Sequence, residues 1–200
     1  DLEGEFVETK PVNVTREMLE ATLEAFRGDI LQVPPMFSAL KRDGKTLYDL
    51  ARAGVEIERE PREVRIEALN VLSFDDELLT IEVTVSKGTY IRVLAEDIGK
   101  ALGCGAHLAS LRRTRVGDLT IDGAVTIAQL KAVDTQALQA YLKPVDALMQ
   151  TLPAVHLNET DTVRFCHGQR LALGLAACDR VRVYGADEQM VGTARVNNRG

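Results

Sequence analysis

Hydrophobic and polar residues alternate along residues 79–85, where leucine, isoleucine and valine occupy every second position. A period of two is typical of a half-buried β-strand. After Gly88 the apolar residues recur at helical spacing as far as Gly103, and Thr89 is the expected N-cap of that helix. The pattern therefore predicts a strand that passes into a helix through residues 86–92.

Similar patterns predict the elements around this junction. A run of apolar residues over 64–71 predicts a partner strand, so the two strands should form a hairpin. Residues 108–116 are expected to form a further strand that ends in a basic cluster. Capping residues and apolar residues at helical spacing predict more helices, which start near Thr15, Leu47, Thr126 and Asp134.

The end of the chain differs in character from the rest. Strand-like runs at 181–184 and 190–196 predict a small, mostly β domain over residues 151–200. Residues 1–150 combine helices and strands. The predicted fold class is therefore α+β, with a mixed, largely antiparallel sheet and flanking helices, followed by a small β domain.

Residues 27–60 break the regular pattern. Pro34-Pro35 excludes regular structure locally, and Lys41 and Lys45 flank a glycine. A long segment that carries basic residues, an aromatic residue and glycines is typical of a substrate-binding loop. The alternative is an ordinary surface insertion.

Composition and charge narrow the class of protein. The chain of 200 residues is 46% hydrophobic and 27% charged, as in ordinary globular domains. We find no apolar run of membrane-spanning length and no secretion signal, so a cytoplasmic protein without a membrane partner is expected. The net charge of -6 argues against a nucleic-acid partner. Residues 86–115, however, carry six lysines and arginines against two acidic residues, so a basic face is compatible with the sequence.

Lys87, Tyr90 and Arg92 gather at the predicted start of the central helix. Backbone N–H groups at a helix N-terminus favour an anion, and a lysine, an aromatic ring and a guanidinium add charge and shape recognition. The alternative is an ordinary connection with a solvated lysine, a core tyrosine and an arginine in a salt bridge.

The sequence offers no set of metal ligands. The three histidines, His107, His156 and His167, lie far apart and have no partner at ligand spacing. The three cysteines lack a C-x-x-C pair. We therefore expect no metal site, and we expect the cysteines to be reduced thiols.

Three blocks of sequence taken together resemble the TruB-type tRNA pseudouridine-55 synthases, which isomerise a uridine in the T-loop of tRNA. The blocks are residues 32–41 with Gly44 and Tyr48, residues 86–92, and residues 102–107 with Leu111-Arg112-Arg113. The resemblance implies the synthase sheet in residues 1–150, with a thumb-like RNA-binding insertion at 27–60. It also implies a PUA-like RNA-binding domain, incomplete at its end, at residues 151–200.

The resemblance also implies roles for individual residues. Arg92 matches the arginine that pairs with the catalytic carboxylate, Tyr90 the tyrosine at the target uracil, and Leu111 a leucine that lines the same pocket. The implied partner is tRNA, and a monomer without metal or organic cofactor is expected. Phosphate contacts are expected from Lys41, Lys45, Lys87, Arg112 and Arg113.

One part of the family's pattern is missing from the sequence. The nucleophilic aspartate belongs to a Gly-His-Thr-Gly-x-Leu-Asp motif, which these 200 residues do not contain. The chain is therefore expected to be the C-terminal part of a synthase and to be inactive alone. Two other hypotheses remain open: a non-catalytic RNA-binding or tRNA-chaperone module and, more remotely, a phosphate-binding metabolic enzyme.

Overall fold

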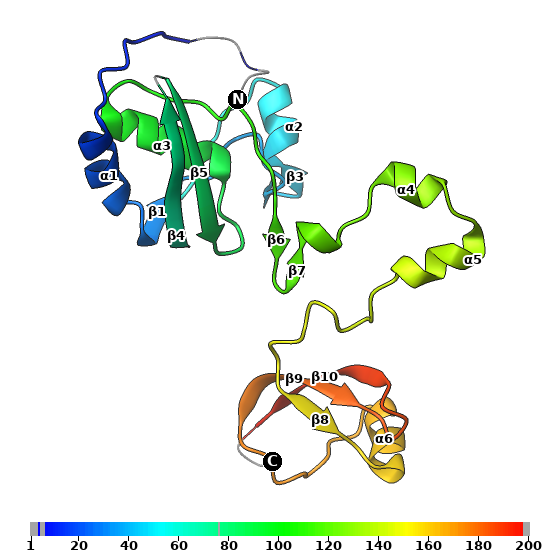
Figure 1. Cartoon of the computed structure of the whole chain (residues 1–200). Helices are drawn as coiled ribbons and strands as arrows, with labels where there is room; N and C mark the ends of the chain where they lie inside the picture. Colours follow the sequence, from blue (N-terminus) through cyan, green and yellow to red (C-terminus); the bar gives the residue numbers. More distant parts are fainter. Residues whose placement is uncertain (1–3, 5–6, 76, 198–200) are drawn as a thin grey trace. The chain divides into compact units, whose positions relative to one another are not determined.

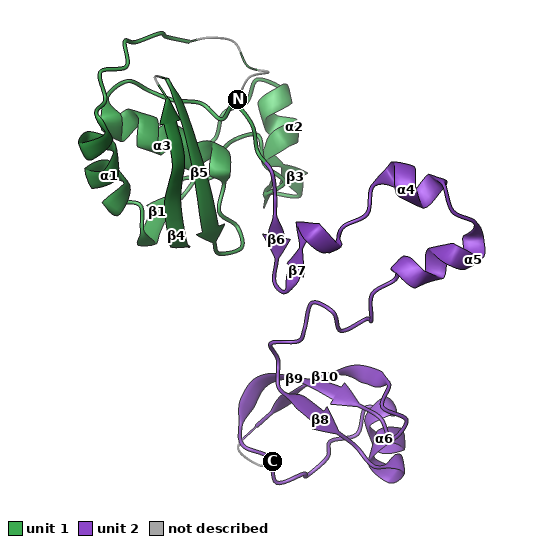
Figure 2. Ribbon diagram, viewed as in Figure 1, with its two compact units in different colours: residues 1–111 green, residues 112–200 purple. Residues whose placement is uncertain are grey.

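The computed structural model describes residues 4, 7–75 and 77–197. The chain folds into two compact units, residues 1–111 and 112–200 (Figure 2). Each unit has its own hydrophobic cluster of buried residues. The two units are therefore described separately.

The first unit contains a three-stranded antiparallel sheet in the order β1-β4-β5. The long strand β4 (Arg62–Asp75) pairs with β5 (Leu78–Val85) on one side and with β1 (Gly28–Gln32) on the other (Figure 1). Strand β4 bulges twice along its pairing with β5. The hairpin predicted from alternating apolar residues is confirmed.

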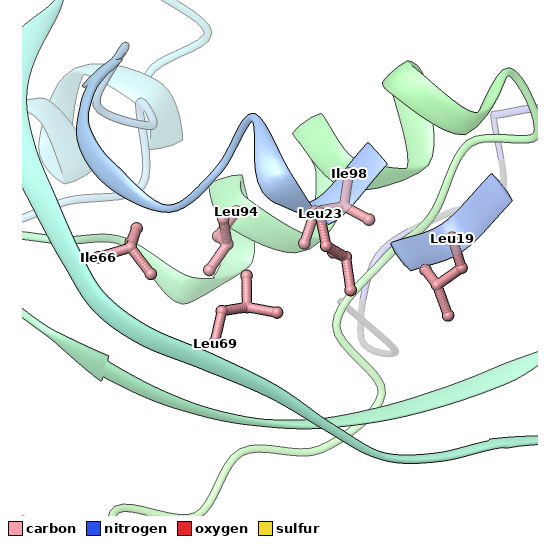
Figure 3. Packing of buried hydrophobic residues seen from close by; sticks show 6 residues of the cluster. All are labelled: Leu19, Leu23, Ile66, Leu69, Leu94 and Ile98. Carbon is pink, nitrogen blue, oxygen red and sulfur yellow. The ribbon is translucent and has the colours of Figure 1, made fainter. Parts of the chain in front are cut away.

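Two helices provide the other half of this core. Helix α1 (Arg16–Glu24) is capped by Thr15, whose side chain accepts a hydrogen bond from the Met18 N–H. Helix α3 (Ile91–Leu102) ends at Gly103, whose φ of 81° is a left-handed conformation that glycine adopts readily. Figure 3 shows the six buried side chains of this cluster, which come from both helices and the sheet: Leu19, Leu23, Ile66, Leu69, Leu94 and Ile98.

The predicted N-cap of α3 is wrong by one residue. Tyr90 occupies the N-cap position and makes no side-chain capping bond. The Thr89 hydroxyl instead donates to the Ser86 carbonyl at 2.9 Å, within a turn that Gly88 closes at a φ of 88°. Short polar side chains often bond to nearby backbone in this way. The Thr89 hydroxyl is therefore bonded within the turn and does not cap the helix.

The segment expected to be an insertion begins with a strand of the sheet. Residues 28–32 form β1, and the irregular part follows it. Strands β2 (Lys41–Arg42) and β3 (Lys45–Thr46) then form a small hairpin. Helix α2 (Leu47–Arg52) follows directly, with Thr46 as its cap.

The predicted strand over residues 108–116 is wrong for most of its length. Only β6 (Arg115–Val116) forms, and it pairs with β7 (Leu119–Thr120). Residues 111–114 are exposed and have no regular structure, because no neighbouring strand pairs with their backbone.

Short helices follow β7 in the second unit. Helix α4 (Ile127–Lys131) has a complete capping box between Thr126 and Gln129, and α5 (Thr135–Leu138) is capped by Asp134. Both predicted helix starts are confirmed. Two 3-10 turns lie beside these helices, η1 (Ile121–Gly123) and η2 (Gln139–Tyr141).

A second three-stranded sheet, in the order β10-β9-β8, ends the chain. Strand β9 (Cys178–Tyr184) pairs in antiparallel fashion with β10 (Met190–Val196) and in parallel with β8 (Ala154–His156). Helix α6 (Glu159–Cys166) adds Phe165 to a core of Leu157, Val181 and Val183. The expected small, mostly β domain is confirmed, although the sequence did not predict β8.

No helix in the part of the chain that the structure describes is long and apolar enough to cross a membrane. The three cysteines, Cys104, Cys166 and Cys178, form no disulfide in the structure.

Candidate nucleic-acid interface and catalytic site

The chain just after β5 is hydrogen-bonded to β4 before it turns into α3. The Ser86 N–H donates to the Arg65 carbonyl at 2.8 Å, and the Ser86 hydroxyl accepts from the Arg65 N–H at 2.9 Å. These bonds continue the strand pairing up to the turn at Gly88. Tyr90 and Arg92 therefore follow a strand end whose position is fixed by these two hydrogen bonds.

The side chain of Gln32 holds the backbone of Tyr90. Its Oε1 accepts from the Tyr90 N–H at 2.8 Å, and its Nε2 donates to the Tyr90 carbonyl at 3.2 Å. Gln32 is the last residue of β1 and is only 2% exposed. This residue was not singled out from the sequence, because its partner lies 58 positions away.

Arg92 lies on the first turn of α3 and is exposed. Its Nη2 donates to the Phe37 carbonyl at 2.9 Å. The nearby acid Glu96 forms an ion pair with Lys100 at 2.7 Å. An arginine guanidinium is planar and carries five N–H donors, a geometry that suits two parallel hydrogen bonds to a carboxylate.

An aromatic cluster lies next to this contact, in the irregular segment. The rings of Phe37 and Tyr48 meet edge to face with centroids 5.9 Å apart, and the Arg52 guanidinium lies 5.8 Å from the Tyr48 centroid. The Tyr48 N–H donates to the Ser38 carbonyl at 3.0 Å, which ties α2 to this block. Phe37 is 51% exposed, and exposed rings of this kind can stack on nucleic-acid bases.

The expected phosphate-binding residues are all exposed, and they fall into three groups. Lys41 and Lys45 lie on the β2–β3 hairpin, and Lys87 lies in the turn before α3. Arg112 and Arg113 begin the second unit. Leu111, expected to line the pocket, is the last residue of the first unit and is 62% exposed.

Comparison with known proteins covers nearly all of the sequence. Residues 1–91 match the family described as TruB family pseudouridylate synthase (N terminal domain). Residues 92–150 match the tRNA pseudouridylate synthase B C-terminal domain, and residues 153–200 match Pseudouridine synthase II TruB, C-terminal. A protein of Dechloromonas aromatica named tRNA pseudouridine synthase B is 48% identical over all of this chain and 67% of its own length.

The chain belongs to the TruB family of pseudouridine synthases.

Other TruB relatives are more similar but longer. Proteins named tRNA pseudouridine synthase B from Burkholderia lata and Ralstonia pickettii are each 54% identical, over 99% and 97% of this chain. The chain spans 63% of the length of each of them. The residues described above therefore lie within sequence that this chain shares with these relatives.

Solved structures agree with the TruB fold. The chain superposes on a structure titled Crystal Structure of a Cbf5-Nop10-Gar1 Complex with a TM-score of 0.72 and 25% identity, covering 92% of this chain and 56% of the other. A structure of an H/ACA RNP bound to a substrate RNA containing 2'-deoxyuridine gives a TM-score of 0.68 at 21% identity, over 92% and 55% of the two chains. The α+β pseudouridine synthase fold with a PUA-like C-terminal domain is thereby confirmed.

The part of this TruB chain that the structure describes contains no group of three or more His, Cys, Asp or Glu side chains that could hold a metal ion. His107 is exposed in the segment after α3, and His156 stacks on Tyr184 with centroids 5.0 Å apart.

A partly buried polar network joins the segment before β8 to the C-terminal sheet. The Asp146 carboxylate accepts hydrogen bonds from the Tyr184 hydroxyl and from Gln150 Nε2. Arg182 donates to Gln150 Oε1 at 2.6 Å and to the Leu152 carbonyl at 2.9 Å. The C-terminal fold therefore uses residues on both sides of the predicted boundary between 150 and 151.

This network gives an expected pH dependence. The Tyr184 hydrogen bond lowers the pKa of Asp146, and the bond to Asp146 raises the pKa of Tyr184. The stabilisation from Asp146 is present above its unfolded pKa of about 3.9 and is lost as pH falls through the lower folded value. The stabilisation from Tyr184 is present below about pH 10 and is lost as pH rises through its higher folded pKa.

We expect hydrogen exchange at residues 150–152 to accelerate at both pH extremes relative to the middle of β9. Asp146→Asn should abolish the acid-side acceleration. The control is Asp179→Asn, which changes an exposed acid on the same strand as Tyr184. Equal pH profiles for wild type and Asp146→Asn would contradict this assignment.

Proposed function

We propose that this chain acts within a tRNA pseudouridine synthase that converts uridine-55 in the T-loop of tRNA to pseudouridine. The observation that carries the proposal is that one short segment, residues 32–37, is hydrogen-bonded to both Tyr90 and Arg92. Gln32 holds the backbone of Tyr90, and the Arg92 guanidinium reaches the Phe37 carbonyl at 2.9 Å. Family membership over three consecutive matched segments supports the same function.

The proposed roles follow from the chemistry of each side chain. Arg92 pairs with the nucleophilic aspartate carboxylate, because a guanidinium keeps a neighbouring carboxylate ionised and orients it through two parallel bonds. Tyr90 packs on the target uracil, and Leu111 lines the same pocket once the base has left its stack. The reaction so assigned needs no metal or organic cofactor.

The proposed partner is the T-loop and stem of tRNA. Lys41, Lys45 and Lys87 would contact phosphates from the first unit, and Arg112 with Arg113 from the start of the second. The insertion expected over residues 27–60, in which Phe37 and Tyr48 are exposed, would close over the loop as the family's thumb-like insertion. We further propose that the protein works in the cytoplasm as a monomer.

The first test uses the 200 residues alone with tRNA labelled with tritium at C5 of uridine. Without an aspartate in the family's motif, this chain should bind tRNA and release no tritium above background. Turnover by the isolated chain would contradict the assignment of the missing nucleophile. Binding with no preference for a T-arm hairpin over an unrelated hairpin would favour the alternative of a general RNA chaperone.

The second test concerns the phosphate contacts. Replacing both Arg112 and Arg113 by alanine should weaken tRNA binding and reduce the slope of log K against log salt by about 2, because each contact releases close to one counterion. The control removes the same charge elsewhere: Lys10→Ala with Arg16→Ala, whose side chains pair with Glu8 and Glu20. An unchanged slope in the Arg112 and Arg113 variant would place the RNA on another surface.

A further inference from the structure

We infer that Gln32 is a positioning residue that sets the place of Tyr90 and of the first turn of α3. The inference rests on the proposed function, since it assigns Gln32 to the same site. It starts from two bonds between the Gln32 amide and the Tyr90 backbone, at 2.8 Å and 3.2 Å. Gln32 itself has no contact with the reacting atoms in this assignment.

The backbone of Tyr90, the N-cap residue of α3, is held by a side chain from outside the helix. Tyr90 is at the N-cap position, and no side chain of the helix accepts a bond there. The Tyr90 carbonyl already receives the first helical bond, from the Leu94 N–H at 3.0 Å. Gln32 supplies the missing acceptor for the Tyr90 N–H and a second donor to the same carbonyl, as a neighbouring strand would.

Few side chains could do this at position 32. The pairing needs one donor and one acceptor on a planar group, which the glutamine amide provides. Since Gln32 is 2% exposed, water cannot readily replace either bond. The backbone of Gln32 is itself fixed, because β1 pairs with β4 up to the register Gln32↔Arg62.

The same short segment also reaches Arg92. Phe37, which follows Gln32 by five positions, accepts the Arg92 hydrogen bond through its carbonyl. Residues 32–37 thus hold the backbone before the helix and a side chain on its first turn. Loss of the Gln32 bonds should loosen the placement of Tyr90 first, and a small misplacement at a reacting centre can cost a large factor in rate.

The structural test uses amide hydrogen exchange on the whole chain. Gln32→Met keeps the length and bulk of the side chain but removes both polar groups. We expect exchange of the Tyr90 amide to accelerate by about tenfold or more, while the Ile98 amide in the middle of α3 changes little. Gln32→Glu, which keeps an acceptor for the Tyr90 N–H, should give a smaller acceleration than Gln32→Met.

Leu19→Ala is the control for general destabilisation, since Leu19 is fully buried in the same unit. It should accelerate Tyr90 and Ile98 in parallel. If Gln32→Met also accelerates the two amides in parallel, or leaves Tyr90 unchanged, Gln32 is a core residue only and the inference is wrong.

The functional test uses a chimeric synthase in which these 200 residues replace the matching part of the Burkholderia lata protein. Gln32→Met should lower kcat by about tenfold or more and change KM by less than about twofold, because phosphate contacts supply most of the tRNA affinity. Gln136→Met, at an exposed glutamine on α5, is the matched control and should change neither constant. A wild-type chimera without activity would refute the proposed function, whereas an active chimera with unchanged kcat in Gln32→Met would refute only this inference.

Discussion

Arg92→Lys in the chimeric synthase is expected to lower kcat by roughly 10- to 100-fold, the equivalent of about one charge-assisted hydrogen bond. Affinity for tRNA should change by less than about threefold, since the positive charge is kept. The reason is geometric. The guanidinium donates to the Phe37 carbonyl from a planar group, whereas an ammonium cannot form the same pair of parallel bonds to a carboxylate. Single-turnover rates and filter binding would measure the two effects separately.

The matched control for this prediction is Arg112→Lys. Arg112 is exposed and is assigned to phosphate contact, where a point charge serves nearly as well as a guanidinium. Its kcat and its tRNA affinity should both stay near the wild-type values. Equal losses of rate and affinity in Arg92→Lys would mean that Arg92 binds RNA and has no special role beside the catalytic carboxylate.

Gly99→Ala should destabilise the first unit by about 1–3 kcal/mol or more, as overpacking of a close contact does. A Cβ atom at Gly99 would lie 2.2 Å from the Ala106 nitrogen and 2.3 Å from the Gly105 carbonyl carbon. Both are backbone atoms, so no rotation of a side chain relieves the clash. The Gly105 N–H also donates to the Gly99 carbonyl at 2.9 Å, and this bond would be strained or lost.

Thermal unfolding of the whole chain would show the Gly99 effect as a lower Tm of the transition that belongs to the first unit. Gly123→Ala is the control, because a Cβ there meets no atom within 4 Å. It should leave the Tm nearly unchanged. A Gly99→Ala protein as stable as wild type would show that the loop at Gly105 and Ala106 moves away without cost.

The spacing of apolar residues predicted those strands and helices that bury one face along a continuous segment. The alternation of residues 79–85 and the helical spacing that follows gave β5 and α3 correctly, because a buried face imposes its period on the chain. The strand expected over 108–116 failed because pairing with another strand, which the sequence does not reveal, decides whether extended chain becomes a strand. Thr89 does not cap the helix, because its hydroxyl donates to the Ser86 carbonyl in the preceding turn.

In the candidate site, too, residues that are close in sequence were predicted and contacts between distant residues were not. Tyr90 and Arg92 were predicted together since they lie in one short motif. The bonds from Gln32 and Phe37 could not be predicted, because they join residues 58 and 55 positions apart. The Asp146 network was missed for the same reason, since its hydrogen bond from Tyr184 spans 38 positions.

The most direct test of the proposed function is to locate the modified nucleotide after the chimeric synthase has acted on unmodified tRNA. Pseudouridine can be mapped at single-nucleotide resolution, and a tRNA with cytidine in place of uridine-55 serves as the control substrate. We expect pseudouridine at position 55 of the normal tRNA and none in the control. Pseudouridine at another position, or an equal yield from the control tRNA, would contradict the proposed function.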